Sequence, residues 1–194
     1  MNEAEQTRWD ARYRNGDLPR GVARVLEDNQ HLLPAAGAAL EIACGRGGNA
    51  LFLAARGLET TALDLSPVAI ADLETEARAR HLPLTARVCD LLAEPLPPAC
   101  CQVLVVSRFL ERALFPALLA ALTPGGLLFY QTFVADPVHA DRGPRNPVHR
   151  LEPNELLTLC RPFRILVYRE EGRVGDPSRG FRDEAQLVAR KPLP

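Results

Sequence analysis

Residues 39–50 read ALEIACGRGGNA, a short apolar run that stops at a glycine-rich loop. The apolar run predicts a β-strand over residues 39–43, and the residues after the loop predict a helix with one apolar face over residues 49–56. Gly45 and Gly47 lack side chains where the backbone must turn sharply and approach a ligand, and the helix start presents unpaired N–H groups there. This order of strand, loop and helix indicates a ligand-binding α/β protein.

The same alternation of short apolar runs and helical patterns continues along the rest of the chain. It predicts an α/β fold with a Rossmann-like, doubly wound sheet that is mostly parallel and binds ligands at the carboxyl ends of its strands. The last two strands lack a convincing helix between them, so they predict an antiparallel hairpin at the C-terminal edge of the sheet. The expected strands are residues 39–43, 60–65, 84–89, 102–107, 127–134, 164–169 and 185–189.

A length of 194 residues is enough for one domain with one substantial core, so we expect a single domain over residues 1–194. Within it, residues 1–36 predict an N-terminal helical segment, with a first helix over residues 3–13 and a second within residues 21–33. Residues 135–150 show no periodicity and contain three prolines, two histidines and three arginines. We expect them to form a long exposed loop on the acceptor side of a ligand site.

Two interpretations of the glycine-rich loop compete. Gly45, Gly47 and Ala50 match the G-x-G-x-x-G/A spacing of dinucleotide-binding proteins, and Asp64 lies 19 residues beyond Gly45, near the expected ribose-binding acid. Glu41 favours a different ligand, because a carboxylate at the strand end would repel a pyrophosphate but attract the ammonium and sulfonium of S-adenosylmethionine (SAM). The strand also opens only after nearly forty residues, whereas dinucleotide domains often begin at that strand.

Several motifs resemble those of one family. Glu41-x-Ala43-x-Gly45-x-Gly47 resembles the acidic-x-Gly-x-Gly-x-Gly signature of class I SAM-dependent methyltransferases. ALDLS resembles their second motif, and LTPGG resembles the turn before their fifth strand. WDARY and CGRGGNALFLAARG are similar to small bacterial methyltransferases related to tellurite-resistance and thiopurine methyltransferases. The resemblance covers nearly the whole chain. Ala43 departs from it, because many members have glycine there, but its methyl group is the smallest possible intrusion and we expect cofactor binding to survive.

The resemblance implies which residues bind the cofactor. Asp64 would accept hydrogen bonds from both ribose hydroxyls, and Asp90 would contact the adenine amino group. Trp9 and Tyr13 would close the cofactor from the N-terminal side. The alternatives are that the two aspartates only cap helices and that Trp9 only docks its own helix. The complete set implied for cofactor binding is Glu41, Ala43, Cys44, Gly45, Gly47, Asp64, Leu65, Asp90, Leu91 and Ser107.

The acceptor should lie near the N-terminal helix, the end of the fourth strand and the loop at residues 135–150. That loop would act as a lid that recruits an anionic acceptor, or it is a plain polar surface loop. No catalytic residue stands out, and a soft nucleophile such as a thiolate or a tellurite-derived anion needs no protein base, whereas an oxygen or nitrogen nucleophile usually does. The candidate acceptor-binding residues are Tyr13, Arg108, His139, Arg145 and His149.

Composition excludes other classes of partner. The net charge of −1 gives no basic field for nucleic acid, and no apolar run is long enough to cross a membrane. The N-terminus is polar, so we expect a cytoplasmic protein, and the five cysteines lack ligand spacing, so we expect reduced thiols and no metal. The predicted function is methyl transfer from SAM to a small-molecule acceptor, for example a thiol or a metalloid oxyanion. An NAD-dependent oxidoreductase and a catalytically silent SAM-binding scaffold are the alternatives.

Overall fold

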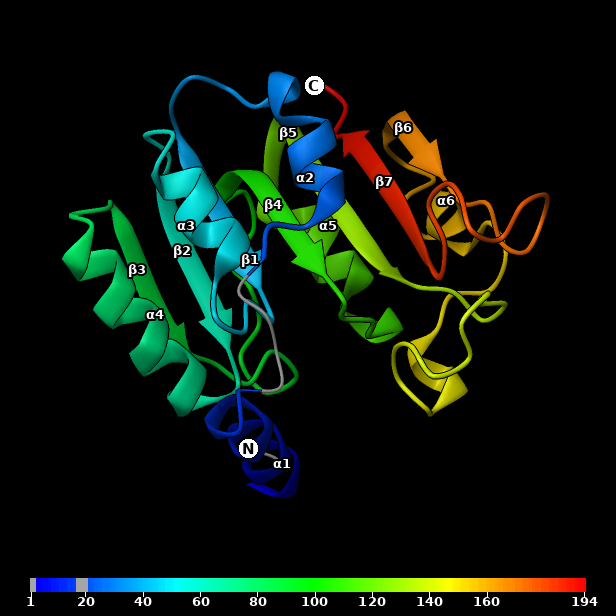
Figure 1. The fold of residues 1–194 in the computed structure, drawn as a ribbon. Coiled ribbons are helices and arrows are strands. Elements are labelled where there is room, and N and C mark those ends of the chain that lie inside the picture. The colour runs from blue at the N-terminus through cyan, green and yellow to red at the C-terminus, as the bar shows by residue number, and fades with distance from the viewer. Residues whose placement is uncertain (1–2, 17–20) are drawn as a thin grey trace.

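A computed structural model describes residues 3–16 and 21–194, and these residues build a seven-stranded sheet (Figure 1). The strand order is β3-β2-β1-β4-β5-β7-β6, with β1 to β5 parallel and β7 antiparallel to both of its neighbours. The strands are β1 (Ala38–Ile42), β2 (Glu59–Asp64), β3 (Leu84–Val88), β4 (Cys101–Ser107), β5 (Leu122–Phe133), β6 (Arg164–Arg169) and β7 (Glu184–Arg190). The predicted fold class, including the antiparallel C-terminal edge, is confirmed.

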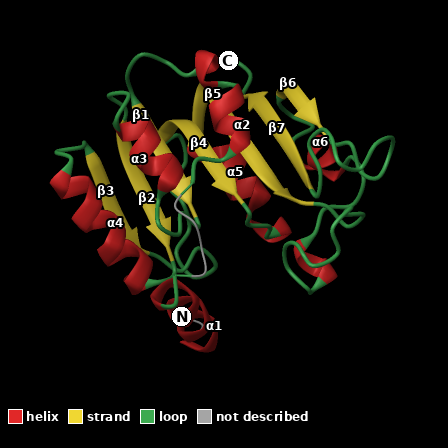
Figure 2. Cartoon of the chain, in the orientation of Figure 1, coloured by secondary structure: helices red, strands yellow, loops and turns green. Residues whose placement is uncertain are grey.

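Helices cover both faces of the sheet (Figure 2). One face carries α2, α3 and α4, and the other carries α5 and α6, whereas α1 lies beyond the carboxyl ends of the strands (Figure 1). The helices are α1 (Glu3–Arg14), α2 (Arg24–Asp28), α3 (Gly48–Ala54), α4 (Pro67–Ala79), α5 (Phe115–Ala121) and α6 (Glu155–Leu159). Short 3₁₀ helices are η1 (Gln30–Leu32), η2 (Arg112–Leu114) and η3 (Pro147–His149).

The two faces explain why the central strands read as continuous apolar runs. Along β4, Val103 and Val105 pack with Phe129 into the core under α2 and α3, and Leu104 and Val106 pack into the core under α5. All five side chains are fully buried. A strand covered on both faces needs apolar residues at consecutive positions, so the run itself indicates a central strand of a parallel sheet.

Two elements differ from their predicted bounds by more than two residues. β5 begins at Leu122 instead of residue 127, because Leu122 already pairs with Cys101 on β4. An irregularity follows, in which Gly125 has a φ of +77°, and regular pairing resumes at Leu127. The helix expected within residues 21–33 is divided at Asn29. The Asn29 side chain donates to the Val25 carbonyl oxygen at 2.9 Å, a local bond that competes with helix continuation.

All five cysteines are free; four are buried, whereas Cys100 is exposed. In residues 3–16 and 21–194, no helix combines the length and the apolar character that a membrane crossing requires.

Candidate cofactor site and acceptor cleft

The glycine-rich loop lies at the carboxyl end of β1 and reverses the chain into α3. Ala43, Gly45 and Gly47 all have positive φ angles, of 48°, 52° and 68°. The Gly47 N–H donates to the Cys44 carbonyl oxygen at 2.8 Å, and the Cys44 N–H donates to the Leu63 carbonyl oxygen at 3.0 Å. These two bonds fix a tight turn against the neighbouring strand β2, and the glycines supply the left-handed backbone that the turn requires.

Glu41 faces the start of α3 and is almost fully buried, at 1% exposure. Its carboxylate accepts one hydrogen bond from the Asn49 side chain and one from the Ala50 N–H, both at 2.7 Å. Burial raises the pKa of Glu41 to about 8, although these two hydrogen bonds oppose the rise. A carboxylate has about four lone-pair sites, so both oxygens keep capacity for a ligand after holding the helix start.

Asp64 ends β2 beside the same loop and is 6% exposed. Its carboxylate accepts hydrogen bonds from the Gly45 N–H at 2.7 Å and from the Ser66 N–H at 2.9 Å. Burial raises the pKa of Asp64, and the backbone hydrogen bonds act in the opposite direction. Asp64 therefore ties the glycine-rich loop to the end of β2, and its predicted ribose contact would be a further role.

Tyr13 of α1 closes the loop from the N-terminal side. A Cβ atom added at Gly45 would lie 2.7 Å from the Tyr13 hydroxyl oxygen, so a residue larger than glycine would displace this ring. Two contacts hold α1 here: Ser66 donates to the Asp10 carboxylate, and Arg46 donates to the Tyr13 carbonyl oxygen at 3.1 Å. Burial raises the pKa of the Tyr13 phenol, and nearby Asp64 adds to this effect.

The charge of the site selects among ligands. Glu41 and Asp64 are two buried carboxylates around one loop, and neither forms an ion pair within the described residues. Burying carboxylates without a cation is unfavourable, so the pair suits a ligand that brings positive charge. A ligand with a sulfonium and an ammonium group fits these two carboxylates, whereas they would repel the pyrophosphate of a dinucleotide.

The other predicted cofactor residues lie along the same edge of the sheet. Leu65 follows β2, and both Asp90 and Leu91 follow β3, where the Asp90 carboxylate accepts a hydrogen bond from the Leu92 N–H at 3.1 Å. Ser107 ends β4 and is partly exposed. The structure therefore brings the predicted residues to one edge. Asp90 also stabilises a local turn, whereas the alternative interpretation had it capping a helix, and no helix lies in the described residues between β3 and β4.

Asn49 and Gln131 are two buried residues of the site that the sequence did not single out. Asn49 donates to Glu41 and, at 3.1 Å, to the Ser107 hydroxyl oxygen, and it accepts from the Ala23 N–H at 2.7 Å. Gln131 accepts from the Val25 N–H at 2.7 Å. Each is a polar side chain inside an apolar run, GNALFLA and LLFYQTF, and that interruption was the available signal.

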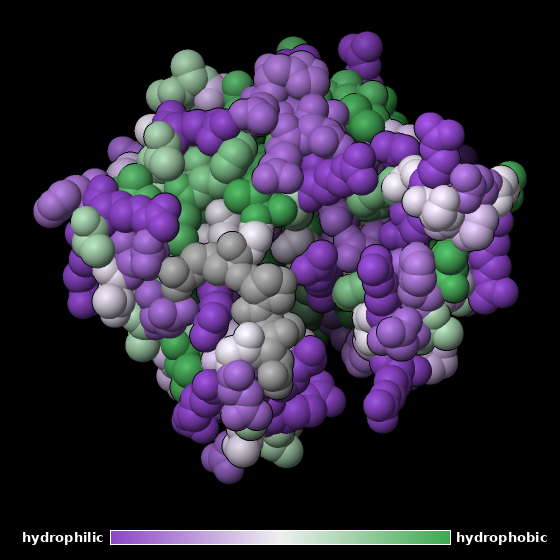
Figure 3. Space-filling model, viewed as in Figure 1, coloured by the Kyte–Doolittle hydropathy of each residue, from purple (hydrophilic) through white to green (hydrophobic). Residues whose placement is uncertain are grey.

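A cleft of about 580 Å³ opens beside the cofactor loop, at the ends of β4 and β5. Mainly hydrophilic residues surround the hollow near the centre of the view (Figure 3). Of the candidate acceptor residues, Arg108 and His139 line the cleft, whereas Tyr13, Arg145 and His149 do not. The lining residues are Gly21, Val22, Ala23, Arg24, Ser107, Arg108, Gln131, His139, Arg142, Pro177, Ser178, Arg179, Gly180, Phe181, Arg182 and Glu184.

Arginine is the commonest charged residue in the lining of this cleft. Five of its lining residues are arginines, and Glu184 is the single carboxylate among the described lining residues. Glu184 is already engaged, because it accepts from the Arg108 guanidinium at 3.1 Å and from the Gln131 side chain. Arg182 is 10% exposed and donates to backbone carbonyls of the β6–β7 connection, so it holds that loop in shape. Arg24 pairs with Asp28 at 3.2 Å and Arg142 lies 3.5 Å from the Asp183 carboxylate, so Arg179 is the lining arginine that forms no ion pair within the described residues.

The loop at residues 135–150 is largely exposed, as predicted, but it is anchored at its end. Arg150 is 7% exposed and donates to the carbonyl oxygens of Val134, Arg142 and Pro144. Arg112 binds the carbonyl oxygen of Arg150 at 2.9 Å and pairs with Glu155 on α6. These bonds fix the loop beside the cleft.

Comparisons with known proteins agree with this geometry. Residues 39–126 match the family model of a methyltransferase domain. The structure superimposes on TehB from Haemophilus influenzae with a TM-score of 0.71 and 19% identity, covering 94% of this chain and 66% of TehB. A SAM-dependent methyltransferase from Methanosarcina mazei gives a TM-score of 0.67 and 20% identity, covering 90% of this chain and all of the other. The chain contains a methyltransferase domain over residues 39–126 and has the class I methyltransferase fold.

The match to a methyltransferase domain supports SAM as the cofactor, in preference to the NAD that the glycine spacing also allowed. A curated relative, hemagglutinin 1 of Eikenella corrodens, is 36% identical over 138 residues, which are 68% of this chain. The chain spans less than half the length of that relative, 45%. The part of the chain that matches a known family is therefore the methyltransferase domain, which includes the motif from Glu41 to Gly47.

Proposed function

We propose that this methyltransferase transfers a methyl group from SAM to a small-molecule acceptor that carries negative charge. One observation carries the proposal: two buried carboxylates, Glu41 and Asp64, surround the glycine-rich loop directly beside a cleft lined by arginines. The carboxylates suit a cationic cofactor, and the arginines suit an anionic acceptor. Opposite charges in these adjacent sites would direct the cofactor to one site and the acceptor to the other.

The residues that would hold the cofactor follow from their positions. Glu41 and the backbone of the loop would hold the methionine portion, and Asp64 would hold the ribose. Asp90 and Leu91 would contact the adenine from the loop after β3. When bound, SAM supplies a methyl group on a leaving group of its own, so the protein needs to orient the acceptor and exclude water.

The acceptor would enter beside Ser107, where the cofactor site meets the cleft. Arginine forms paired hydrogen bonds with carboxylate, phosphate and other oxyanions, so Arg108 and Arg142 suit an acceptor of that kind. Thiols and metalloid oxyanions, the acceptors suggested by the sequence, remain within this class when they carry negative charge.

The cofactor half of the proposal is tested by calorimetry with SAM, S-adenosylhomocysteine and NAD. We expect SAM to bind and NAD to fail, and Asp64→Ala to weaken SAM binding at least tenfold, or about 1.4 kcal/mol. Glu59→Ala is the matched control, because Glu59 is exposed at the opposite end of the same strand β2. Unchanged affinity in Asp64→Ala would remove Asp64 from the site, and binding of NAD in place of SAM would contradict the proposal.

A further inference from the structure

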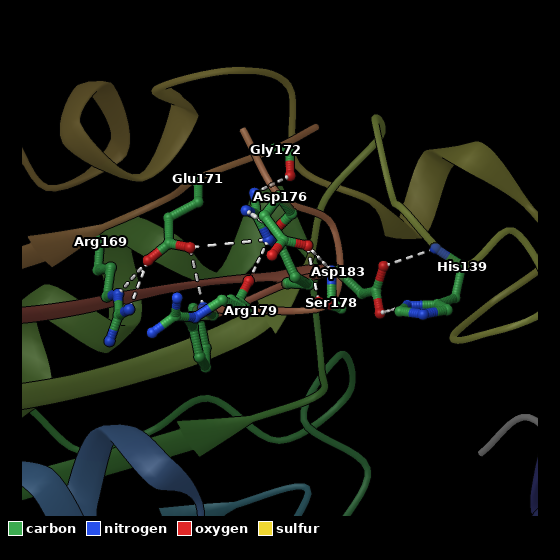
Figure 4. Close-up of polar contacts among 10 residues, drawn as sticks. His139, Arg169, Glu171, Gly172, Asp176, Ser178, Arg179 and Asp183 are labelled. Carbon is green, nitrogen blue, oxygen red and sulfur yellow. Dashed lines mark hydrogen bonds and ion pairs between the residues drawn. The ribbon is translucent and has the colours of Figure 1, made fainter. Parts of the chain in front are cut away.

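His139 and Asp183 form a fixed pair at the edge of the acceptor cleft (Figure 4). One oxygen of the Asp183 carboxylate accepts a hydrogen bond from the backbone N–H of His139 at 2.8 Å. The other oxygen lies 2.7 Å from Nδ1 of the His139 ring. Asp183 is 2% exposed and directly precedes β7, and its carbonyl oxygen accepts from the Val134 N–H at 3.0 Å. The carboxylate therefore holds the imidazole from the rigid sheet.

The pair determines which ring nitrogen is free. Burial alone would raise the pKa of Asp183, but the hydrogen bonds from His139 outweigh it and keep that pKa below its ordinary value. An ionised carboxylate only accepts hydrogen bonds, so Nδ1 of His139 must carry the proton. In the neutral ring the lone pair is then on Nε2, and the ring is 44% exposed. A neutral imidazole with Nδ1–H on a carboxylate is oriented for proton removal through Nε2.

Other groups around the pair are mostly cationic. Arg142 lies 3.5 Å from the Asp183 carboxylate, and Arg108, Arg179 and Glu184 line the same cleft as His139. Ser107 lines it too, at the end of β4, where the cleft adjoins the cofactor site. An anionic acceptor held by these arginines would therefore lie between the base and the cofactor. The positive surroundings would also favour the ionised form of its nucleophile.

We propose that His139, oriented by Asp183, is the general base that removes the proton from a hydroxyl nucleophile of the anionic acceptor. This rests on the proposed methyl transfer. The acceptor oxygen gives its proton to Nε2, its lone pair forms the bond to the methyl carbon, and the bonding pair of the sulfonium carbon–sulfur bond returns to sulfur. The products are the methylated acceptor, S-adenosylhomocysteine and a protonated His139.

The first test needs neither cofactor nor acceptor. Nitrogen-15 NMR of the ligand-free protein distinguishes a protonated Nδ1 from a protonated Nε2 in the neutral ring. We expect the proton on Nδ1, and we expect Asp183→Asn to lose this preference. A neutral His139 with its proton on Nε2 would overturn the proposal, whether or not SAM binds.

The second test uses turnover of para-hydroxybenzoate and para-mercaptobenzoate, with their methyl esters as uncharged counterparts. His139→Asn retains a side-chain donor for Asp183 but has no Nε2 base. We expect this variant to lose about 100-fold or more in kcat for the hydroxyl acceptor, with little change in KM. The thiol acceptor, which ionises without help, should lose little.

The controls separate this inference from the proposed function. His31→Asn makes the same change at an exposed residue of η1, away from the cleft, and should behave as the original protein. SAM affinity measured by calorimetry should be unchanged in His139→Asn. Equal losses for hydroxyl and thiol acceptors, or turnover of the esters in preference to the anions, would overturn the base and its acceptor class. Failure of SAM to bind at all would instead overturn the proposed function.

Discussion

At the scale of single residues, Ala43 shows how the family motif is adapted here. It stands where many relatives have glycine, and its φ of 48° lies in the left-handed region. A left-handed conformation costs a non-glycine residue about 1–2 kcal/mol. Ala43→Gly removes this cost, but ordering the more flexible glycine backbone on folding costs about 0.5–1 kcal/mol.

We therefore expect Ala43→Gly to raise the free energy of unfolding by about 0.5–1 kcal/mol, measured by urea denaturation. Ala71→Gly is the matched control, because Ala71 is exposed within α4 and has no such strain, so that variant should lose stability. A loss of stability in Ala43→Gly as well would show that the left-handed backbone at this position is not strained.

Glu41 makes stability depend on pH. Its pKa is about 8 in the folded protein and near 4.5 when unfolded, so the folded state binds more protons between these values. Stability should therefore fall as pH rises from 5 to 8, by at most about 1.4 kcal/mol per pH unit for this group. Glu41→Gln cannot ionise and should show a smaller fall by urea denaturation of the ligand-free protein. If the free energy of unfolding fell equally with pH in both proteins, the raised pKa of Glu41 would be contradicted.

At the scale of elements, the buried guanidinium of Arg150 is a main anchor of the loop at residues 135–150. Arg150→Met removes the bonds to three carbonyl oxygens, and bonds to a charged group contribute about 1.5–3 kcal/mol each. We expect faster amide exchange across the loop by mass spectrometry, with SAM affinity unchanged because Glu41 and Asp64 lie elsewhere. Arg145→Met alters an exposed arginine of the same loop and should leave exchange as it is. Unchanged exchange in Arg150→Met would show that other contacts hold the loop.

At the scale of the whole molecule, the cofactor site joins β1, β2 and β4 with α1 and α3, so a ligand there should stabilise the entire fold. S-adenosylhomocysteine at 100 times its Kd should raise the free energy of unfolding by about 2.7 kcal/mol. Thermal unfolding with and without the ligand measures this, and Asp64→Ala at the same ligand concentration should gain less. A gain of equal size in that variant would place the ligand elsewhere.

The sequence located the strands because hydrophobic patterning is local. Residues 164–169 were predicted with the bounds that the structure shows, since an apolar run between turns fixes a strand without reference to its partners. It located the cofactor loop for the same reason, because Gly45 and Gly47 report a backbone requirement at their own positions. The start of β5 was missed because its first pairing, Leu122 with Cys101, depends on a neighbouring strand.

By itself, then, the sequence determined the fold class, the loop after β1 and the charge of the residues around it. Only the tertiary structure decided which distant side chains meet. Gln131 reaches Val25 across 106 residues, and Asp183 reaches His139 across 44. Spacing along a chain specifies contacts only within a helix turn or a strand pair. Contacts between loops depend on how the packed sheet orients them, so the arginine-lined cleft and the pairing of His139 with Asp183 became visible only in three dimensions.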